Sequence, residues 1–180
     1  MTEQKPTRSR PKVPFDVQVR VFFRDAWLCH WCRRPVIFPP ALRLLQHFVE
    51  TSGNSRPLAY FHPHWSRHSA PLLDHLGAVV DHVEAYSKNS PHTEANFVTA
   101  CNKCNARKSD RQASDYRKQE PGTPIRGKYG EPCDWDGFVS LFLLLAERTE
   151  LRPSEQQWAL AFRSNFRDRA SQTGAGVQKM

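Results

Sequence analysis

The sequence lacks any long hydrophobic run. Its longest apolar stretch, residues 138–146, is interrupted by Ser140, whereas a helix that spans a membrane needs about 20 apolar residues. Residues 1–12 are basic and contain prolines but no apolar core, so they do not resemble a secretion signal. We therefore expect no membrane segment and a cytoplasmic location.

Cysteine is scarce, with five in 180 residues, and in a reducing compartment so few thiols are poor candidates for disulfides. Four of them form two C-x-x-C pairs, Cys29/Cys32 and Cys101/Cys104, which supply the thiolates of a closed tetrahedral zinc site. Such a zinc is expected to stabilise the fold without taking part in chemistry. The alternative is four reduced core cysteines. Cys133 has no partner pair and is expected to be structural.

Acidic residues are fewer than basic ones, 18 against 26, which gives a formal net charge of +8. This balance favours a polyanionic partner, although basic surfaces also serve solubility alone. Basic charge is concentrated in residues 102–118, which hold six basic and two acidic residues. Phosphate contacts from such a segment would give affinity without sequence information.

No internal repeat divides the chain, and its length suits one small α+β domain with appendages. The predicted divisions are a basic flexible arm (1–14), a main domain (15–118) with an irregular insertion (36–75), a linker (119–137), a helical extension (138–170) and a flexible tail (171–180). Helical periodicity follows Asp16, a plausible N-cap, and recurs from Phe138 to Leu145. A capping box at Ser154-x-x-Gln157 predicts the start of the last helix.

The middle of the chain predicts the order strand, loop, strand, helix. Residues 76–86 are apolar and β-branched, residues 87–95 are polar, and residues 96–100 form a second short apolar stretch. The charged residues that follow have few apolar positions, which indicates a solvated or ligand-facing helix.

This unit carries a distinctive set of polar residues. Asp81 and His82 end the first strand, Asn96 precedes the second, and Asn105 directly follows the second cysteine pair. The string GAVVDHVEAYSKNSPHTEANFVTACNKCNARKSDR resembles the core of HNH endonucleases, the ββα-metal nucleases, in the variant whose third letter is Asn. Those nucleases commonly carry two C-x-x-C pairs placed as here. The resemblance covers about a third of the chain, over residues 16–35 and 76–112.

The resemblance implies a ββα-metal core stapled by a four-cysteine zinc site, and cleavage of DNA that depends on Mg²⁺ or Mn²⁺. It also implies products with 5′-phosphate and 3′-hydroxyl ends, and a single site that nicks one strand at a time. A double-strand break would need two copies, as in a homodimer, or two visits. A partner protein that supplies targeting is compatible with the sequence.

The chemistry of the residues fits these implied roles. A neutral imidazole can take a proton from water near pH 7, so His82 is the expected general base. Mg²⁺ prefers oxygen ligands, which Asp81 and Asn105 would supply. By the resemblance, Asn96 holds the loop that carries His82. Alternation along a strand separates Asp81 from His82, so both can serve one site only where the strand bends into its loop.

Four basic residues near Asn105 are expected to bind nucleic acid: Lys103, Arg107, Lys108 and Arg111. Lys108 can share the helical face of Asn105 and contact a phosphate. For Arg111, solvated surface is an equal alternative.

Two features depart from the family pattern. Because the third motif residue is Asn, we expect preference for Mg²⁺ or Mn²⁺ over Ni²⁺ or Zn²⁺. The insertion holds histidines and aromatic residues, namely His47, His62, His64, His68, His75, Tyr60, Phe61 and Trp65. We favour a partly buried lid or fold extension over direct contact with substrate. The rival function is a non-catalytic, zinc-stabilised nucleic-acid-binding or adaptor module.

Overall fold

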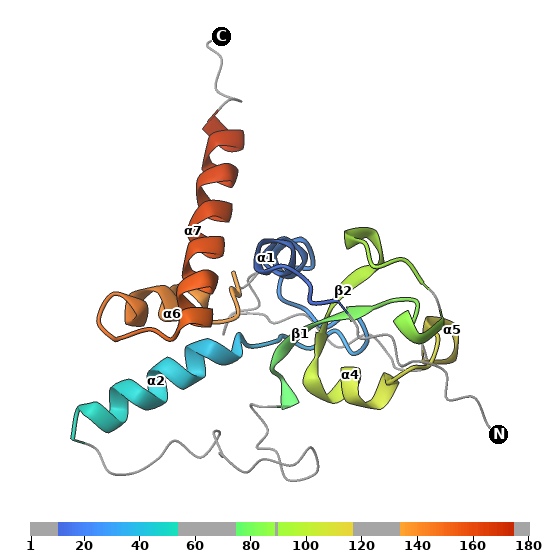
Figure 1. The fold of residues 1–180 in the computed structure, drawn as a ribbon, viewed down its shortest axis with the longest axis horizontal. Helices are drawn as coiled ribbons and strands as arrows, with labels where there is room; N and C mark the ends of the chain where they lie inside the picture. Colours follow the sequence, from blue (N-terminus) through green and yellow to red (C-terminus); the bar gives the residue numbers. More distant parts are fainter. Residues whose placement is uncertain (1–10, 54–74, 89, 117–133, 175–180) are drawn as a thin grey trace, which may run out of the picture.

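The computed structural model describes residues 11–53, 75–88, 90–116 and 134–174, shown in colour in Figure 1. The elements are α1 (Phe15–Arg24), α2 (Pro39–Thr51), β1 (Ala78–His82), η1 (Tyr86–Lys88), η2 (Glu94–Asn96), β2 (Phe97–Cys101), α4 (Asn102–Lys108), α5 (Ala113–Tyr116), α6 (Val139–Ala146) and α7 (Pro153–Gly174). The predicted α+β class is confirmed. No described helix is long and apolar enough to cross a membrane.

The sheet consists of β1 and β2, which pair antiparallel with Ala78 opposite Cys101 and His82 opposite Phe97. β1 lies within the predicted stretch 76–86, and β2 runs one residue beyond the predicted stretch 96–100, to Cys101. The helix predicted after β2 is shorter than expected, because α4 ends where Ser109 takes a positive φ of 52°. A separate short helix, α5, follows it.

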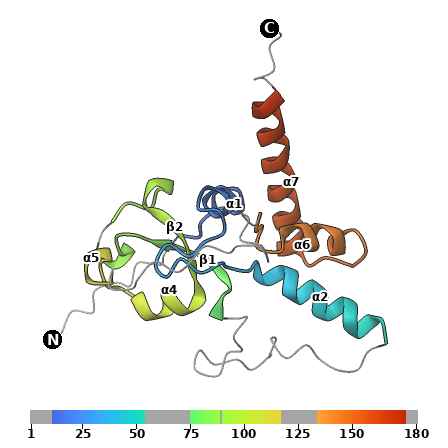
Figure 2. The same cartoon turned by 180° about the vertical axis from the view of Figure 1, so that it is seen from behind.

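The other helices lie on the far side of α1 from the sheet. Figures 1 and 2 show α2, α6 and α7 together at one side, and β1, β2, α4 and α5 at the other, with α1 between them. Helix α1 packs on α7 and on the sheet, and α2 packs on α6. Through α1, the helical side therefore supports the strands that carry the site.

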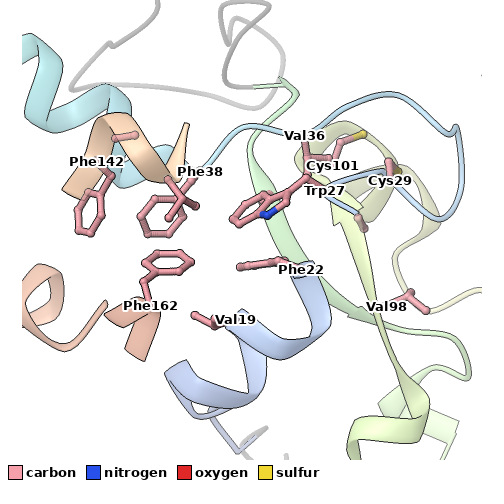
Figure 3. Close-up of a cluster of buried hydrophobic side chains, with 14 of the residues drawn as sticks. Val19, Phe22, Trp27, Cys29, Val36, Phe38, Val98, Cys101, Phe142 and Phe162 are labelled. Carbon is pink, nitrogen blue, oxygen red and sulfur yellow. The ribbon is translucent and has the colours of Figure 1, made fainter. Parts of the chain in front are cut away.

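A continuous aromatic core joins the two sides (Figure 3). The ring of Phe38 lies 5.0 Å from those of Phe142 and Phe162, both edge-on, an arrangement that aromatic pairs prefer. The core continues through Trp27 towards the cysteines. Gly137 has a φ of 67°, and a Cβ there would lie 2.2 Å from the Trp27 ring, so this position needs glycine.

The predicted irregular insertion contains a regular element, since residues 39–51 form α2. Pro39 and Pro40 begin this helix, because proline is favoured in the first turn, where its missing N–H is not needed. The buried residues Ala41, Leu42 and Leu44 then face the core. The remaining insertion residues from 54 to 74, with most of its histidines and aromatics, lie outside the described residues, as does Cys133.

Three expected helix starts need correction. Pro14, and not Asp16, occupies the cap of α1, and Asp16 pairs with Arg20 one turn later at 2.9 Å. Helix α6 begins after Phe138, whose φ is 70°. At the start of α7 the backbone N–H of Arg152 donates to Oε2 of Glu155 at 2.9 Å. Glu155, and not the predicted Gln157, therefore caps the first turn. The last helix thus begins at residue 153, directly beside α2, because Glu155 also pairs with Arg43.

Candidate active site

The two C-x-x-C pairs meet at the end of the sheet. Their four Sγ atoms all lie within 4.8 Å of one another, and those of Cys32 and Cys101 are 4.0 Å apart. Ligands at 2.3 Å from a tetrahedral zinc would be separated by about 3.8 Å. The donor set and its spacing therefore fit a metal ion bound by four thiolates.

Local backbone geometry prepares these cysteines. The N–H of Arg33 donates to the carbonyl oxygen of Cys29 at 2.8 Å and closes the first turn, and Arg33 itself has a φ of 58°. In the second pair, the N–H of Cys104 donates to Sγ of Cys101 at 3.4 Å. An N–H aimed at sulfur stabilises a thiolate.

The four thiols lie close enough to change one another's pKa. A hydrogen bond with Cys101 lowers the pKa of the Cys32 thiol, whereas a hydrogen bond with Cys104 raises the pKa of Cys101. Thiolates are the form that binds a metal ion, so binding releases the protons of the thiols, and the affinity for the metal falls as the pH falls.

The carboxylate of Asp81 is 4% exposed and is bonded from several directions. Its Oδ1 accepts the backbone N–H of His82 at 2.8 Å, and its Oδ2 accepts Nε1–H of Trp31 at 2.9 Å. Trp31 lies between Cys29 and Cys32, so the first cysteine turn directly contacts this carboxylate. Each carboxylate oxygen has two lone pairs, and Oδ1 therefore retains capacity to accept a cation.

Lys108 does not lie on the surface that would meet a phosphate, which corrects the prediction from sequence. The residue is 0% exposed. Its Nζ donates to the carbonyl oxygen of His82 at 2.7 Å, lies 3.5 Å from Oδ2 of Asp81, and is 5.3 Å from the centre of the Trp31 ring. A buried charge needs such partners. Lys108 thus compensates the buried charge of Asp81.

His82 has a different set of neighbours from Asp81. The strand pairing continues through His82, which lies opposite Phe97, so the bend into the loop comes only after it. The imidazole is 1% exposed and lies edge-on to Phe97 at 4.9 Å and tilted to Tyr86 at 5.8 Å. Its Nε2 is 3.1 Å from Nδ1 of His92. A second histidine therefore contacts the expected general base.

Asn96 ties together the loop between the strands. Its Oδ1 accepts the backbone N–H of Glu84 at 2.9 Å, and its Nδ2 donates to the carbonyl oxygens of Glu84 and Pro91 at 3.1 and 3.0 Å. Arg20 of α1 adds an outer contact to this loop, with Nη2 2.8 Å from Oε2 of Glu94. The bonds suit the loop-holding role expected of Asn96, which stays a prediction.

Asn105 lies in α4, half-buried, and its side-chain amide makes no hydrogen bond within the described part of the chain. Lys108 lies three residues further along α4 and reaches Asp81, so the side of the helix that they share faces β1. One carboxylate and one amide oxygen, with positions left for water, suit a hard cation such as Mg²⁺. The donors present thus fit such an ion.

Of the other basic residues expected to bind nucleic acid, Arg107 and Arg111 are exposed and Lys103 is half-buried. The Arg111 guanidinium lies 5.2 Å from the Tyr116 ring and donates to the carbonyl oxygens of Arg107 and Lys108. These contacts restrain Arg111, while Arg107 extends from the end of α4 into solvent.

Comparison with known protein families found a match in the segment that holds most of these residues. A family model described as HNH endonuclease matches residues 71–111. Over these 41 of its 180 residues, the chain is similar to the HNH endonuclease family. The matched segment includes Asp81, His82, Asn96, Asn105 and the second cysteine pair, whereas the first pair lies outside it. No curated protein and no solved structure matches the chain.

Sequence reasoning missed two residues of this site, Trp31 and His92. Trp31 could be noted as an aromatic residue inside a C-x-x-C turn, but nothing in the sequence names Asp81 as its partner. His92 lies in a polar loop without periodicity, where spacing predicts no contact. The first is placed by the cysteine cluster and the second by the bonds of Asn96.

Proposed function

We propose that this protein is a metal-dependent endonuclease that hydrolyses phosphodiester bonds of DNA. The observation that carries the proposal is the HNH match, which brings Asp81, His82, Asn96 and Asn105 into one short segment. The folded arrangement supports it, because β1 presents Asp81 to the helix that bears Asn105. The basic residues of α4, Arg107 and Lys103 with Arg111, would hold the DNA backbone.

In the proposed reaction His82 takes a proton from the attacking water. Asp81 and Asn105 would hold Mg²⁺ or Mn²⁺, which when bound stabilises negative charge on the phosphoryl and leaving oxygens. The four cysteines would hold zinc, the usual ion of closed all-sulfur sites. One such domain would nick one strand, leaving 5′-phosphate and 3′-hydroxyl ends. We place the protein in the cytoplasm, where its thiols would stay reduced.

A second function has one observation in its favour. Asp81 and His82 are 4% and 1% exposed, so in this structure neither side chain offers much surface to a substrate. A non-catalytic, zinc-stabilised module that binds nucleic acid or another protein would tolerate that burial. In the nuclease, DNA binding must open access to these side chains.

Nicking of supercoiled plasmid separates the two functions. Zinc-loaded wild type would be incubated with Mg²⁺, Mn²⁺ or EDTA, beside His82→Ala and a matched control, His47→Ala, which alters a histidine of α2. We expect open-circle DNA with either cation, no product with EDTA or with His82→Ala, and wild-type activity for His47→Ala. Binding of DNA without any cleavage would favour the non-catalytic module, and equal cutting by all three proteins would indicate another source of activity.

A further inference from the structure

The His82 and His92 rings form a pair that is enclosed by aromatic side chains. Their centroids are 5.3 Å apart, and the Phe97 ring contacts both, at 4.9 and 5.0 Å. Tyr86 lies 5.8 Å from His82 and 5.7 Å from His92. Rings packed in this way have little freedom to turn, so the contact between Nε2 of His82 and Nδ1 of His92 at 3.1 Å is a defined feature of the fold.

Between two neutral imidazoles this contact requires one N–H and one lone pair. If Nε2 of His82 donates, the lone pair of His82 lies on Nδ1, and a proton from water is taken there. If Nδ1 of His92 donates instead, Nδ1 of His82 carries a proton, and the lone pair of His82 on Nε2 is occupied by His92. Of the two arrangements, only the first leaves the lone pair of His82 on the nitrogen that does not contact His92, as the proposed general base requires.

We infer that His92 is a positioning residue for His82: its Nδ1 accepts the Nε2–H of His82 and thereby fixes the orientation and tautomer of that ring. The kinetic consequence rests on the proposed nuclease function, but the hydrogen bond does not. Asn96 supports this placement, because it binds the carbonyl oxygen of Pro91, the residue before His92.

The other nitrogen of His92 argues against a purely structural role. Its Nε2 is inaccessible to solvent and has no hydrogen-bond partner among the described residues. In either tautomer this leaves a buried polar atom unsatisfied, which is unfavourable. A phenylalanine would fill similar space without that penalty. A histidine at this position is therefore explained by its bond to His82 better than by packing.

The first test observes the tautomer directly. Long-range ¹H–¹⁵N correlation spectra of the zinc-loaded protein, without DNA or Mg²⁺ and at a pH where the imidazoles are neutral, distinguish protonated from unprotonated ring nitrogens. His82→Ala and His92→Phe would assign the two rings among the eight histidines. We expect Nε2 of His82 to be protonated in the wild type. A proton on Nδ1 of His82 would overturn the inference.

Two variants of His92 then test the consequence. His92→Phe keeps the ring shape without an acceptor, whereas the shorter amide of His92→Asn can place Oδ1 near the position of Nδ1. In His92→Phe we expect a mixture of His82 tautomers and a kcat for nicking lowered about 10- to 100-fold, with KM for DNA changed by less than about threefold. His92→Asn should restore the tautomer and most of kcat, and His47→Phe should match the wild type.

The melting temperature of His92→Phe shows whether His92 positions the His82 ring or only stabilises the fold. Because His92→Phe removes an unsatisfied polar atom, its melting temperature should equal or exceed that of the wild type. A lower melting temperature with unchanged tautomer would make His92 merely structural and overturn the inference. If the tautomers behave as expected but no protein nicks DNA, the proposed function fails and the positioning contact stands. Wild-type nicking by His92→Phe would instead support the proposed nuclease function and overturn the positioning role of His92.

Discussion

The two sides of β1 hold neighbouring residues in contrasting ways. Asp81 is held by charge and hydrogen bonds from Trp31 of the cysteine turn and Lys108 of α4. His82 is held by aromatic rings and His92 from the loop between the strands. The side chains of two groups proposed to act on one phosphate are therefore held by separate parts of the protein, while Lys108 also binds the main-chain carbonyl oxygen of His82. The contrast implies that one side can be damaged while the other stays intact.

The largest effect is expected where both sides depend on the same support. Loss of the metal, by chelation or by Cys104→Ser, should unfold the junction of β2 and α4, because binding to a four-thiolate site contributes directly to folding. We expect a fall in melting temperature of more than about 10 °C and loss of the His82 tautomer signal. Circular dichroism and metal analysis provide the measurement.

Cys133→Ser is the matched control, since Cys133 belongs to neither C-x-x-C pair of the sequence. Acidification should lower the melting temperature, as chelation does, because protons compete with the metal ion for the thiolates. An unchanged melting curve in chelator, with the metal shown to be absent, would mean that the cysteines do not support the fold in this way.

The next effect centres on Asp81, although Lys108 also donates to the main-chain carbonyl oxygen of His82. Lys108→Met should lower the free energy of unfolding by about 3 to 5 kcal/mol, because it leaves a buried carboxylate without its compensating charge. In Lys108→Met the salt dependence of DNA binding should stay unchanged. In Arg107→Ala the slope of log K against log salt concentration should fall by about one released ion. Urea denaturation and binding titrations at several salt concentrations measure the two quantities. A stable Lys108→Met protein with a reduced salt dependence would restore the phosphate contact predicted from sequence.

A milder change sharpens the contrast between the two sides. Trp31→Phe keeps a ring in the cysteine turn but removes the N–H that binds Asp81, so we expect a loss of about 1 to 3 kcal/mol in stability. Binding of Mn²⁺, measured by electron paramagnetic resonance without DNA, should weaken, while the His82 tautomer stays as in the wild type. Trp135→Phe is the matched control, since its indole N–H binds a backbone carbonyl elsewhere, that of Val36 at 2.8 Å. Weakened Mn²⁺ binding in both variants would assign the effect to general destabilisation.

The sequence could predict the parts of this site that depend on spacing. The cysteine pairs, the two strands and the order of Asp81, His82, Asn96 and Asn105 follow from periodicity and from resemblance, and the strands and the cysteine cluster are found where expected. The burial of Lys108 could not be predicted, because helical spacing shows on which face of a helix a residue lies but not how deeply that face is buried. Its burial depends on Trp31, 77 positions earlier in the chain.

The smallest effect tests how the loop on the His82 side is anchored. Arg20 and Glu94 pair at 2.8 Å, but their side chains are 45% and 40% exposed, so the pair is screened by water and salt. Glu94→Gln should lower stability by less than about 1 kcal/mol, with the difference disappearing at high salt. Asp16→Asn removes the other acidic partner of Arg20 and is the matched control.

The tautomer of His82 is the measurement that shows whether this outer ion pair helps to position the ring. Asn96 already binds the backbone at both ends of the loop, so Glu94→Gln should leave the His82 ring signals unchanged, whereas Asn96→Ala should disturb them. If Glu94→Gln alone mixed the tautomers, the loop would be held from α1 and not from within. The two sides of β1 would then share α1 as a support, and the independence inferred from their contacts would be lost.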